Sequence, residues 1–227
     1  MYIIIYINMG ENFYNLKSVK EYQTKAFNPN FGNKHFIEIP SRILIVGPSG
    51  SGKSNTLLNL IKRFNGTFNH IYLGLKNSNE PLYQMLIKKL GDSITVYENG
   101  EIPRLSDIQP NGEQLFIFDD LVGDKGANQI IEDYFKLGRK KNITSIYLSQ
   151  SYFKTPKFIR DNLSYLIIKK ITSKKELKLI LNDYPITNIN IDQLKNIYEK
   201  TTKKFEDCLS IDVLNHKLYY NFNKLIN

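Results

Sequence analysis

Short, continuous apolar runs recur between residues 42 and 168, and most are followed by a polar turn and then by a segment of helical periodicity. A run of four to seven mostly apolar residues is typical of a strand that is buried on both faces of a sheet. This pattern predicts strands over residues 42–46, 70–75, 94–97, 114–118, 143–149 and 165–168.

Apolar residues at spacings of three and four positions predict the helices that separate these strands. The predicted helices cover residues 53–64, 80–90, 128–137, a short turn that begins at Pro156, and residues 174–181 and 192–200. Strands that alternate with helices indicate an α/β fold, with a mostly parallel sheet covered by helices on both faces.

The remainder of the chain is assigned to three parts. Residues 1–40 are polar and irregular after a short apolar start, and we expect an N-terminal extension there. Residues 41–182 form the predicted core. Residues 183–227 form a predicted annex of a helix and a C-terminal β-hairpin, with strands at 209–214 and 217–222.

The segment GPSGSGKS matches the phosphate-loop pattern G-x-x-x-x-G-K-[ST] in full, and it lies between a predicted buried strand and a predicted helix. Glycines let successive backbone N–H groups point at phosphate oxygens, and the helix N-terminus favours the same anion. We expect the Lys53 ammonium to reach the β and γ phosphates and the Ser54 hydroxyl to bind Mg²⁺. The predicted nucleotide-binding residues are Gly47, Pro48, Ser49, Gly50, Ser51, Gly52, Lys53, Ser54 and Asn55.

A second acidic site follows the strand predicted at 114–118, which ends in Asp119 and Asp120. Asp119 is expected to hold Mg²⁺, and Asp120 to orient and deprotonate the attacking water. The chain between Lys53 and Asp119 has room for two helices and two strands. ATPases with an additional catalytic acid have an extra strand between the two strands that carry the phosphate site, and a resemblance to them implies one here. The guanine-reading tetrapeptide N-K-x-D is absent, so ATP and Mg²⁺ are the expected cofactors.

Two further polar residues are candidates for the catalytic machinery. Gln150 follows the strand predicted at 143–149, where its amide could sense the γ-phosphate or align the water. Arg139 lies just after a predicted helix and could stabilise charge on the nucleotide of a neighbouring subunit. Arg160 is the competing candidate for that role, and a solvated or DNA-facing Arg139 is the simpler alternative.

The charge of the chain is concentrated in one segment. Lysine and arginine number 31 against 22 acidic residues, a net charge of +9. Residues 134–178 hold 12 basic residues and two acidic ones, Asp161 and Glu176, so 12 − 2 gives +10 for this segment alone. Lysine-rich composition does not explain why acids avoid one segment, and a polyanion such as DNA is the expected partner. The basic residues are Lys136, Arg139, Lys140, Lys141, Lys154, Lys157, Arg160, Lys169, Lys170, Lys174, Lys175 and Lys178.

Other classes of protein fit poorly. The single cysteine, Cys208, excludes an internal disulfide and a cysteine-rich zinc site. The longest apolar run, residues 2–7, is far shorter than the ~20 residues that span a bilayer. It has no basic segment ahead of it and no cleavage site, so secretion is not expected. Met9 is an alternative initiator.

The segments GPSGSGKS, FIFDDL and GRKKNITSIYLSQSYFKTPKFIRDN together resemble the FtsK–HerA superfamily of DNA-pumping P-loop ATPases. Within it, residues 40–170 are similar to the poxvirus-type genome-packaging ATPases of large DNA viruses, virophages and polinton-like elements. The resemblance implies a ring, hexameric or pentameric, that hydrolyses ATP to drive double-stranded DNA into a preformed capsid. It also implies work in the host cytoplasm, at the viral factory, with the virion as a second location.

The resemblance implies the same residue roles. Lys53 and Ser54 would contact the nucleotide and the metal, Asp119 would hold Mg²⁺ and Asp120 would activate the water. Gln150 would be the sensor of the γ-phosphate, and Arg139 the arginine finger that acts on the nucleotide of a neighbouring subunit. Cellular pumps of the superfamily usually have Asp-Glu where this chain has Asp-Asp, which the viral branch shares. Two alternatives stay open: a P-loop kinase of a nucleotide or small molecule, and a non-enzymatic ATP- and DNA-binding component of a virion. The Asp-Asp pair and the lack of an arginine-rich lid count against the kinase.

Overall fold

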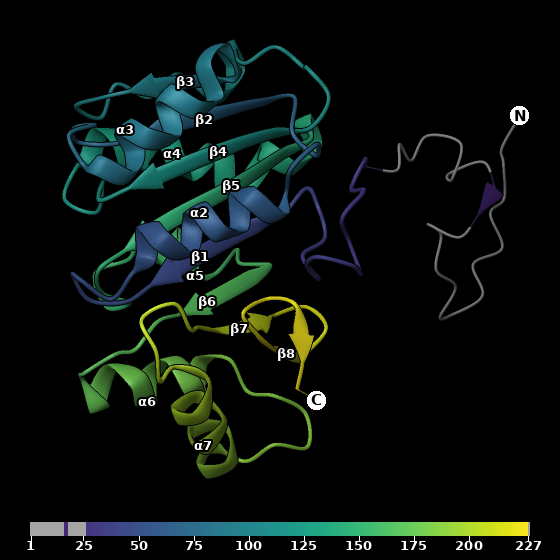
Figure 1. Cartoon of the computed structure of the whole chain (residues 1–227), viewed down its shortest axis with the longest axis vertical. Helices are drawn as coiled ribbons and strands as arrows, with labels where there is room; N and C mark the ends of the chain where they lie inside the picture. The colour runs from purple at the N-terminus through teal and green to yellow at the C-terminus, as the bar shows by residue number, and fades with distance from the viewer. Residues whose placement is uncertain (1–15, 18–25, 227) are drawn as a thin grey trace, which may run out of the picture.

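The computed structural model describes residues 16–17 and 26–226, and its described strands all belong to one sheet. The strands are β1 (Arg42–Val46), β2 (His70–Gly74), β3 (Ile94–Tyr97), β4 (Gln114–Asp119), β5 (Ile143–Ser149), β6 (Tyr165–Ile168), β7 (Leu209–Asp212), β8 (Lys217–Tyr220) and β9 (Lys224–Leu225). The α-helices among them are α2 (Lys53–Arg63), α3 (Pro81–Leu90), α4 (Lys125–Leu137), α5 (Lys157–Arg160), α6 (Lys174–Asp183) and α7 (Ile191–Thr201). The predicted elements are therefore confirmed, with ends that shift by a few residues (Figure 1).

The order of strands across the sheet is β3-β2-β4-β5-β1-β6-β7-β8-β9. The first six run parallel, and the last three are antiparallel to their neighbours. Strand β5 separates β1 from β4, which confirms the extra strand expected between the phosphate-site strands. Val46 pairs with Ser149 and Asp119 with Leu148, so the carboxyl ends of all three strands meet at one edge of the sheet.

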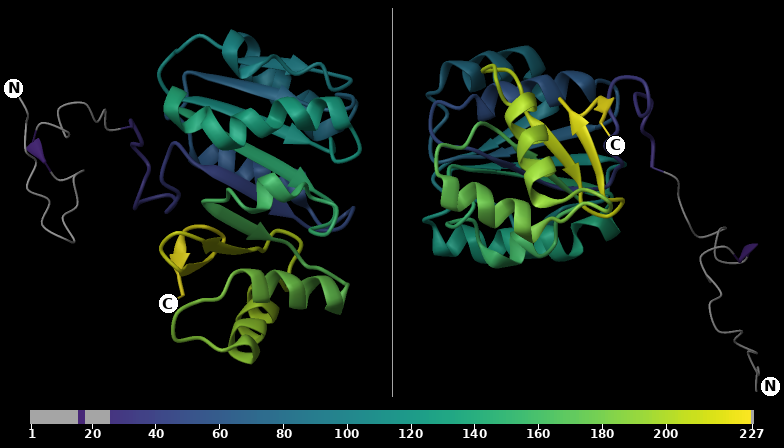
Figure 2. Two further views of the ribbon diagram at one scale, coloured as in Figure 1. Left: turned by 180° about the vertical axis from the view of Figure 1, so that it is seen from behind. Right: turned by 90° about the horizontal axis from the view of Figure 1, so that it is seen from below.

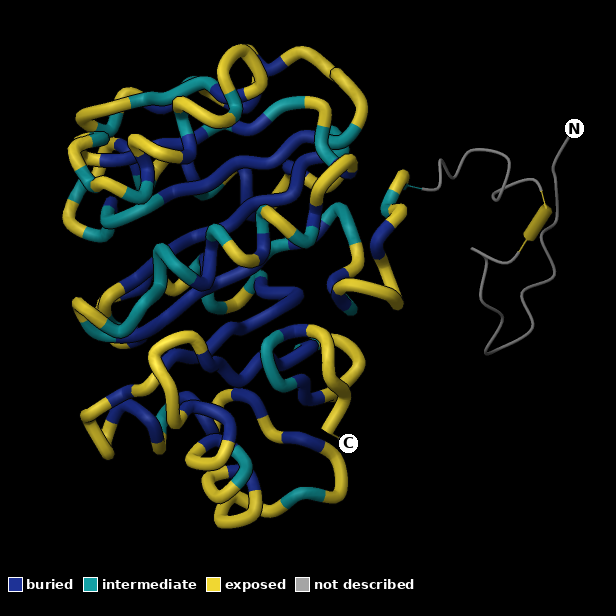
Figure 3. The backbone as a smooth tube through the Cα atoms, viewed as in Figure 1, coloured by how far each residue is buried: buried dark blue, intermediate teal, exposed yellow. Residues whose placement is uncertain are grey.

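Helices cover both faces of the sheet because its central strands are apolar on both sides. In β1, Ile43 and Ile45 pack in one core with α2 and α3, whereas Leu44 and Val46 pack in the other with α4, α5 and α6. The two layers lie in front of and behind the sheet (Figures 1 and 2). The central strands are buried along their length, and exposed residues gather in the helices and loops around them (Figure 3).

The predicted C-terminal hairpin is confirmed as β7 and β8, and β9 extends it. Strand β7 pairs with β6, so these strands continue the sheet of the core rather than forming a separate layer. The boundaries at residues 40 and 182 remain a prediction. The apolar run at 2–7 and Met9 lie outside the described residues. No helix in the described part of the chain is long and apolar enough to cross a membrane.

Residues 26–40 lie against the core, and His35 is the polar residue buried deepest there. Its ring is fully buried, with its centroid 4.7 Å from the Phe64 ring, and its Nδ1 accepts the Ile37 N–H at 3.2 Å. Burial, aided by the positive charge of Arg63, lowers the pKa of His35 to about 4. The folded chain therefore holds this imidazole neutral.

The contribution of His35 to stability is expected to fall as the pH drops from about 6.5 to about 4, because the unfolded chain then takes up a proton at His35 that the folded chain does not take up. The largest loss from this group is about 3 kcal/mol in the free energy of unfolding. Urea unfolding at a series of pH values measures it. His35→Asn keeps a neutral polar group, so the free energy of unfolding should change less between about pH 6.5 and pH 4. If its pH dependence is the same as that of the wild type, His35 is not the group responsible.

Candidate functional site

The phosphate loop joins the buried strand β1 to α2, and its backbone is arranged for an anion. Gly52 is the N-cap of α2 with φ 86°, and no side chain caps the helix, so its first N–H groups are free to bind a ligand. The Lys53 ammonium donates to the carbonyls of Gly47 at 2.9 Å and Pro48 at 3.2 Å. It therefore lies along the loop, in the position from which it would contact phosphates.

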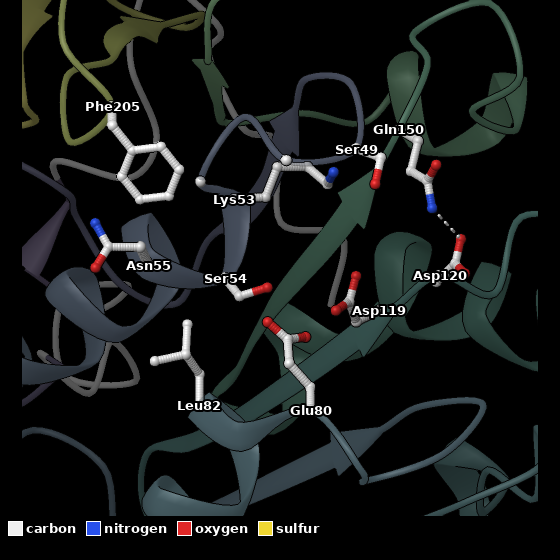
Figure 4. A pocket seen from close by; sticks show the side chains of 12 residues that line it. Ser49, Lys53, Ser54, Asn55, Glu80, Leu82, Asp119, Asp120, Gln150 and Phe205 are labelled. Atoms are coloured by element: carbon white, nitrogen blue, oxygen red, sulfur yellow. Dashed lines mark hydrogen bonds between the residues drawn. The ribbon is translucent and has the colours of Figure 1, made fainter.

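A pocket of about 350 Å³ opens over this loop (Figure 4). The predicted nucleotide-binding residues that line it are Ser49, Gly50, Gly52, Lys53, Ser54 and Asn55. Gly47 and Pro48 contribute the carbonyls that hold Lys53, whereas the Ser51 hydroxyl is buried and makes no hydrogen bond to a described residue. The other lining residues are Glu80, Leu82, Asp119, Asp120, Gln150 and Phe205.

Asp119 is a half-buried carboxylate at the end of β4, and it lines the pocket over the loop. Its Oδ2 accepts the Tyr83 hydroxyl at 2.5 Å. Burial raises the pKa of Asp119 to about 6, although the Tyr83 bond and the charge of Lys53 act in the other direction. Burial likewise lowers the pKa of the Lys53 ammonium, and the carboxylate of Asp119 opposes this shift.

The oxygen donors at this point suit a hard divalent cation. Mg²⁺ prefers carboxylate, hydroxyl and phosphate oxygens together with water, and the Ser54 hydroxyl and the Asp119 carboxylate line one pocket. A cation there would offset the desolvation of Asp119 that its raised pKa reflects. The residues present therefore fit Mg²⁺ bound together with a nucleotide.

Asp120 leaves β4 in a left-handed conformation, with φ 55°. This turn, which is uncommon outside glycine, asparagine and aspartate, separates its carboxylate from that of Asp119. The Gln150 amide donates to Asp120 Oδ1 at 3.1 Å (Figure 4). The Lys76 ammonium lies 3.7 Å from Asp120 Oδ2. Strand β5 thus brings the predicted sensor amide to the predicted base.

Arg139 lies near the amino ends of the parallel strands, whereas these residues lie near the carboxyl ends. It belongs to a 3₁₀ turn, Gly138–Lys141, that precedes β5, whereas the phosphate loop follows the carboxyl end of the parallel strand β1. Arg139 is exposed, and its charge helps burial to lower the pKa of Arg42 at the start of β1. A five-residue strand separates the two ends by roughly 16 Å, so Arg139 cannot reach the nucleotide of its own subunit.

Arg160, the competing candidate, is held within the chain. Its guanidinium lies 5.0 Å from the centroid of the Tyr152 ring, and its Nε donates to the Thr155 carbonyl at 3.2 Å. The guanidinium of Arg160 is therefore less available to a neighbouring subunit than that of Arg139, which is exposed.

The basic segment does not form one continuous surface. Lys169 is buried, and its ammonium donates to the carbonyls of Phe205 at 2.7 Å and Asp207 at 2.8 Å. Lys141 donates to backbone carbonyls as well. Both lysines direct their charge at backbone carbonyls, which need donors, and the buried Lys169 is not available to DNA. The exposed lysines at and before α6 are Lys170, Lys174, Lys175 and Lys178.

Four residues in or beside the pocket were not predicted from the sequence. Glu80, Leu82 and Tyr83 lie at the start of α3, which follows β2. A helix that begins after a parallel strand lies on the same side of the sheet as the phosphate loop, and this signal could have found them. Phe205 lies between α7 and β7, far along the chain, and no local pattern marks it.

Comparison with solved structures agrees with this fold. The genome packaging NTPase B204 of Sulfolobus turreted icosahedral virus 2, in complex with sulfate, matches 81% of this chain and 96% of its own with a TM-score of 0.60 and 15% identity. The cytoplasmic domain of the Thermomonospora curvata type VII secretion ATPase EccC matches 82% of this chain and 24% of its own, with a TM-score of 0.52 and 15% identity. The fold is that of P-loop ATPases.

Sequence relatives point to one group of viruses. The DNA packaging protein OPG160 of Variola virus is 27% identical over 204 residues, which cover 80% of this chain and 72% of the relative. Its counterpart in Vaccinia virus strain Copenhagen is 26% identical over the same shares. The family model described as Poxvirus A32 protein matches residues 28–212, from the segment before β1 to the end of β7. A match over most of the chain, together with the intact phosphate loop and acid pair, means that this protein belongs to the poxvirus A32 family.

Proposed function

We propose that this protein is an ATP-driven motor that translocates double-stranded DNA, and that its task is to package a viral genome into a capsid. The relatives named as DNA packaging proteins and the packaging NTPase with the same fold support this proposal. Capsid components are then its second class of partner, and the viral factory in the host cytoplasm is the expected place of work, with the virion as a second location.

One observation carries the proposal: strand β5 lies between β1 and β4, so that Lys53, Asp120 and Gln150 surround a single pocket. Lys53 would neutralise charge on the β and γ phosphates, and Asp120 would orient and deprotonate a water for attack on the γ-phosphorus. Gln150, bonded to Asp120, would hold that carboxylate in place. Mg²⁺ on Ser54 and Asp119, when bound, would supply further neutralisation of the phosphates.

The position of Arg139 supports a ring as the active form. In a head-to-tail ring, one surface of each subunit contacts a different surface of the next. Arg139 and the phosphate loop lie at opposite edges of the sheet, so only a neighbouring subunit could bring the two together. A hexamer or a pentamer would meet this need.

The purified protein is expected to hydrolyse ATP only when Mg²⁺ is present, and to do so faster when duplex DNA is added. Steady-state phosphate release measures both effects. Lys53→Ala, prepared in the same way, is the control for contaminating ATPases, because it removes the phosphate-contacting ammonium. ATP turnover without any response to DNA would contradict the motor, and ATP binding without turnover would favour the non-enzymatic alternative.

DNA binding is expected to be insensitive to sequence and to weaken steeply with salt, because lysine–phosphate contacts dominate it. Replacing Lys170, Lys174 and Lys175 with glutamine should lower the affinity for a duplex and reduce the salt slope by up to about 0.9 for each phosphate that the variant no longer neutralises. Fluorescence anisotropy in a salt series measures both quantities.

A matched triple replacement on the opposite helical layer provides the control. Lys62, Lys88 and Lys89 are exposed in the last turns of α2 and α3, and their removal lowers the net charge by the same amount. If the control weakens DNA binding as much as the α6 set does, the effect reflects total charge and the α6 surface is not the DNA contact.

A further inference from the structure

Phe205 is an aromatic residue with an exposed ring and a fixed backbone. Its side chain lines the pocket above the phosphate loop, and the residue is 60% exposed. Its carbonyl accepts the buried Lys169 ammonium at 2.7 Å, and the same ammonium donates to the carbonyl of Asp207. Phe205 differs from the other exposed aromatic residues because it lines this pocket, where its ring could cover part of a bound ligand.

The packing of Gly52 shows how closely Phe205 approaches the loop. A Cβ atom built on Gly52 would lie 2.9 Å from the Phe205 carbonyl oxygen and 3.0 Å from the ring. Glycine is therefore required at position 52 for two reasons: its φ is 86°, and a Cβ atom would clash with Phe205. The ring lies beside the phosphate loop, near Asn55 and Lys53, and lines the pocket (Figure 4).

The direction of a bound nucleotide follows from the residues around the loop. The γ-phosphate belongs beside Asp120 and Gln150, and Lys53 spans the β and γ phosphates. Asn55 follows Ser54 in the first turn of α2, where backbone N–H groups would meet the α-phosphate. In Figure 4, Asn55 and Phe205 lie on one side of Lys53, and Asp120 and Gln150 lie on the other. The base must therefore leave the loop on the side of Phe205.

We propose that Phe205 is the stacking platform for the purine base of the nucleotide, which places a residue from the segment between α7 and β7 in the ATP site. This inference rests on the proposed function, because it assumes that the loop binds a nucleoside triphosphate. Stacking of a base on an aromatic ring gives affinity without reading the base, and the fixed backbone reduces the entropy that binding would cost. Truncation of such a ring lowers affinity by roughly 5- to 150-fold.

The chain offers a direct optical test because it contains no tryptophan. Phe205→Trp would introduce a single indole at the proposed stacking position. Its fluorescence is expected to be quenched on titration with Mg²⁺ and a non-hydrolysable ATP analogue, and to stay unchanged with Mg²⁺ and inorganic tripolyphosphate, which fills the loop but has no base. Equal responses to the two ligands would overturn the inference.

Affinities separate stacking from a purely structural role. Phe205→Ala should bind the ATP analogue at least about fivefold more weakly and bind tripolyphosphate as the wild type does, whereas Phe205→Tyr should keep the affinity for both. Phe153→Ala, which removes another exposed ring that does not line the pocket, is the control and should change neither.

Each other outcome counts against the proposal. If Phe205→Ala loses affinity for the ATP analogue and for tripolyphosphate equally, the ring only supports the loop. If it keeps its affinity for both, the base lies elsewhere. In both cases the wild type still binds tripolyphosphate, so the phosphate site stands and only the stacking role fails. A wild-type protein that binds neither ligand would refute the nucleotide site itself, and the stacking role with it.

Discussion

ATP hydrolysis is expected to slow by about 10²- to 10⁴-fold when Asp120 is replaced by asparagine, while the affinity for ATP stays within about twofold. The amide keeps the size of the carboxylate and can still accept the Gln150 bond, but it cannot take a proton from water. Asparagine also tolerates the left-handed backbone at this position, where φ is 55°. The loss would therefore be chemical rather than structural. Single-turnover hydrolysis and equilibrium binding of ATP measure the two quantities separately.

The matched control is Asp133→Asn, which makes the same change at an exposed position of α4. It should turn over ATP like the wild type. If Asp120→Asn also does so, Asp120 is not the base, and Glu80, which lines the same pocket, becomes the next candidate.

Loss of the Arg139 guanidinium is expected to lower ATP turnover by roughly 10³- to 10⁵-fold, the range measured for arginine fingers that act between proteins. Arg139→Lys should be nearly as slow as Arg139→Ala, because an ammonium cannot bond two phosphate oxygens in the planar geometry of arginine. ATP binding should be unaffected, since Arg139 lies at the far edge of the sheet from its own phosphate loop. The neighbouring exposed Lys140→Ala is the control for a nonspecific effect of charge.

Mixing two inactive proteins tests whether the guanidinium acts between subunits. Arg139→Ala retains an intact phosphate loop, and Lys53→Ala retains an intact Arg139. In a mixed ring, some interfaces pair the intact parts, and partial recovery of turnover is expected there. Failure to recover, with mixed assemblies demonstrated by mass, would transfer the role to Arg160 or leave Arg139 as a DNA contact.

The core of the fold was predictable because its signals are local. Each buried strand is a continuous apolar run, and the phosphate loop and the Asp119–Asp120 pair lie at strand ends that the parallel arrangement brings to one edge. The position of β5 between β1 and β4 was expected for another reason: ATPases with an additional catalytic acid have an extra strand there.

The parts that could not be predicted depend on contacts between distant segments. Lys169 looks like any other lysine of a basic stretch, yet it is buried because the carbonyls of Phe205 and Asp207, more than thirty positions away, need a donor. The order of elements could have placed Tyr83 near the phosphate loop, but its hydrogen bond to Asp119 depends on how α3 packs and could not be predicted from spacing. Pattern and motif determine which residues can react, whereas long-range packing determines which of them are accessible.

The two edge strands of the described sheet limit how the subunits of the proposed ring could join. Its outermost strands are β3, with four residues, and β9, with two, and short edge strands are poor templates for adding a strand from another chain. A ring of this protein would then be held by side chains and loops instead of a main-chain ladder between subunits. Interfaces of that kind can slide or tilt without breaking backbone hydrogen bonds, so successive subunits could change their relative orientation with each ATP consumed while every sheet stays intact.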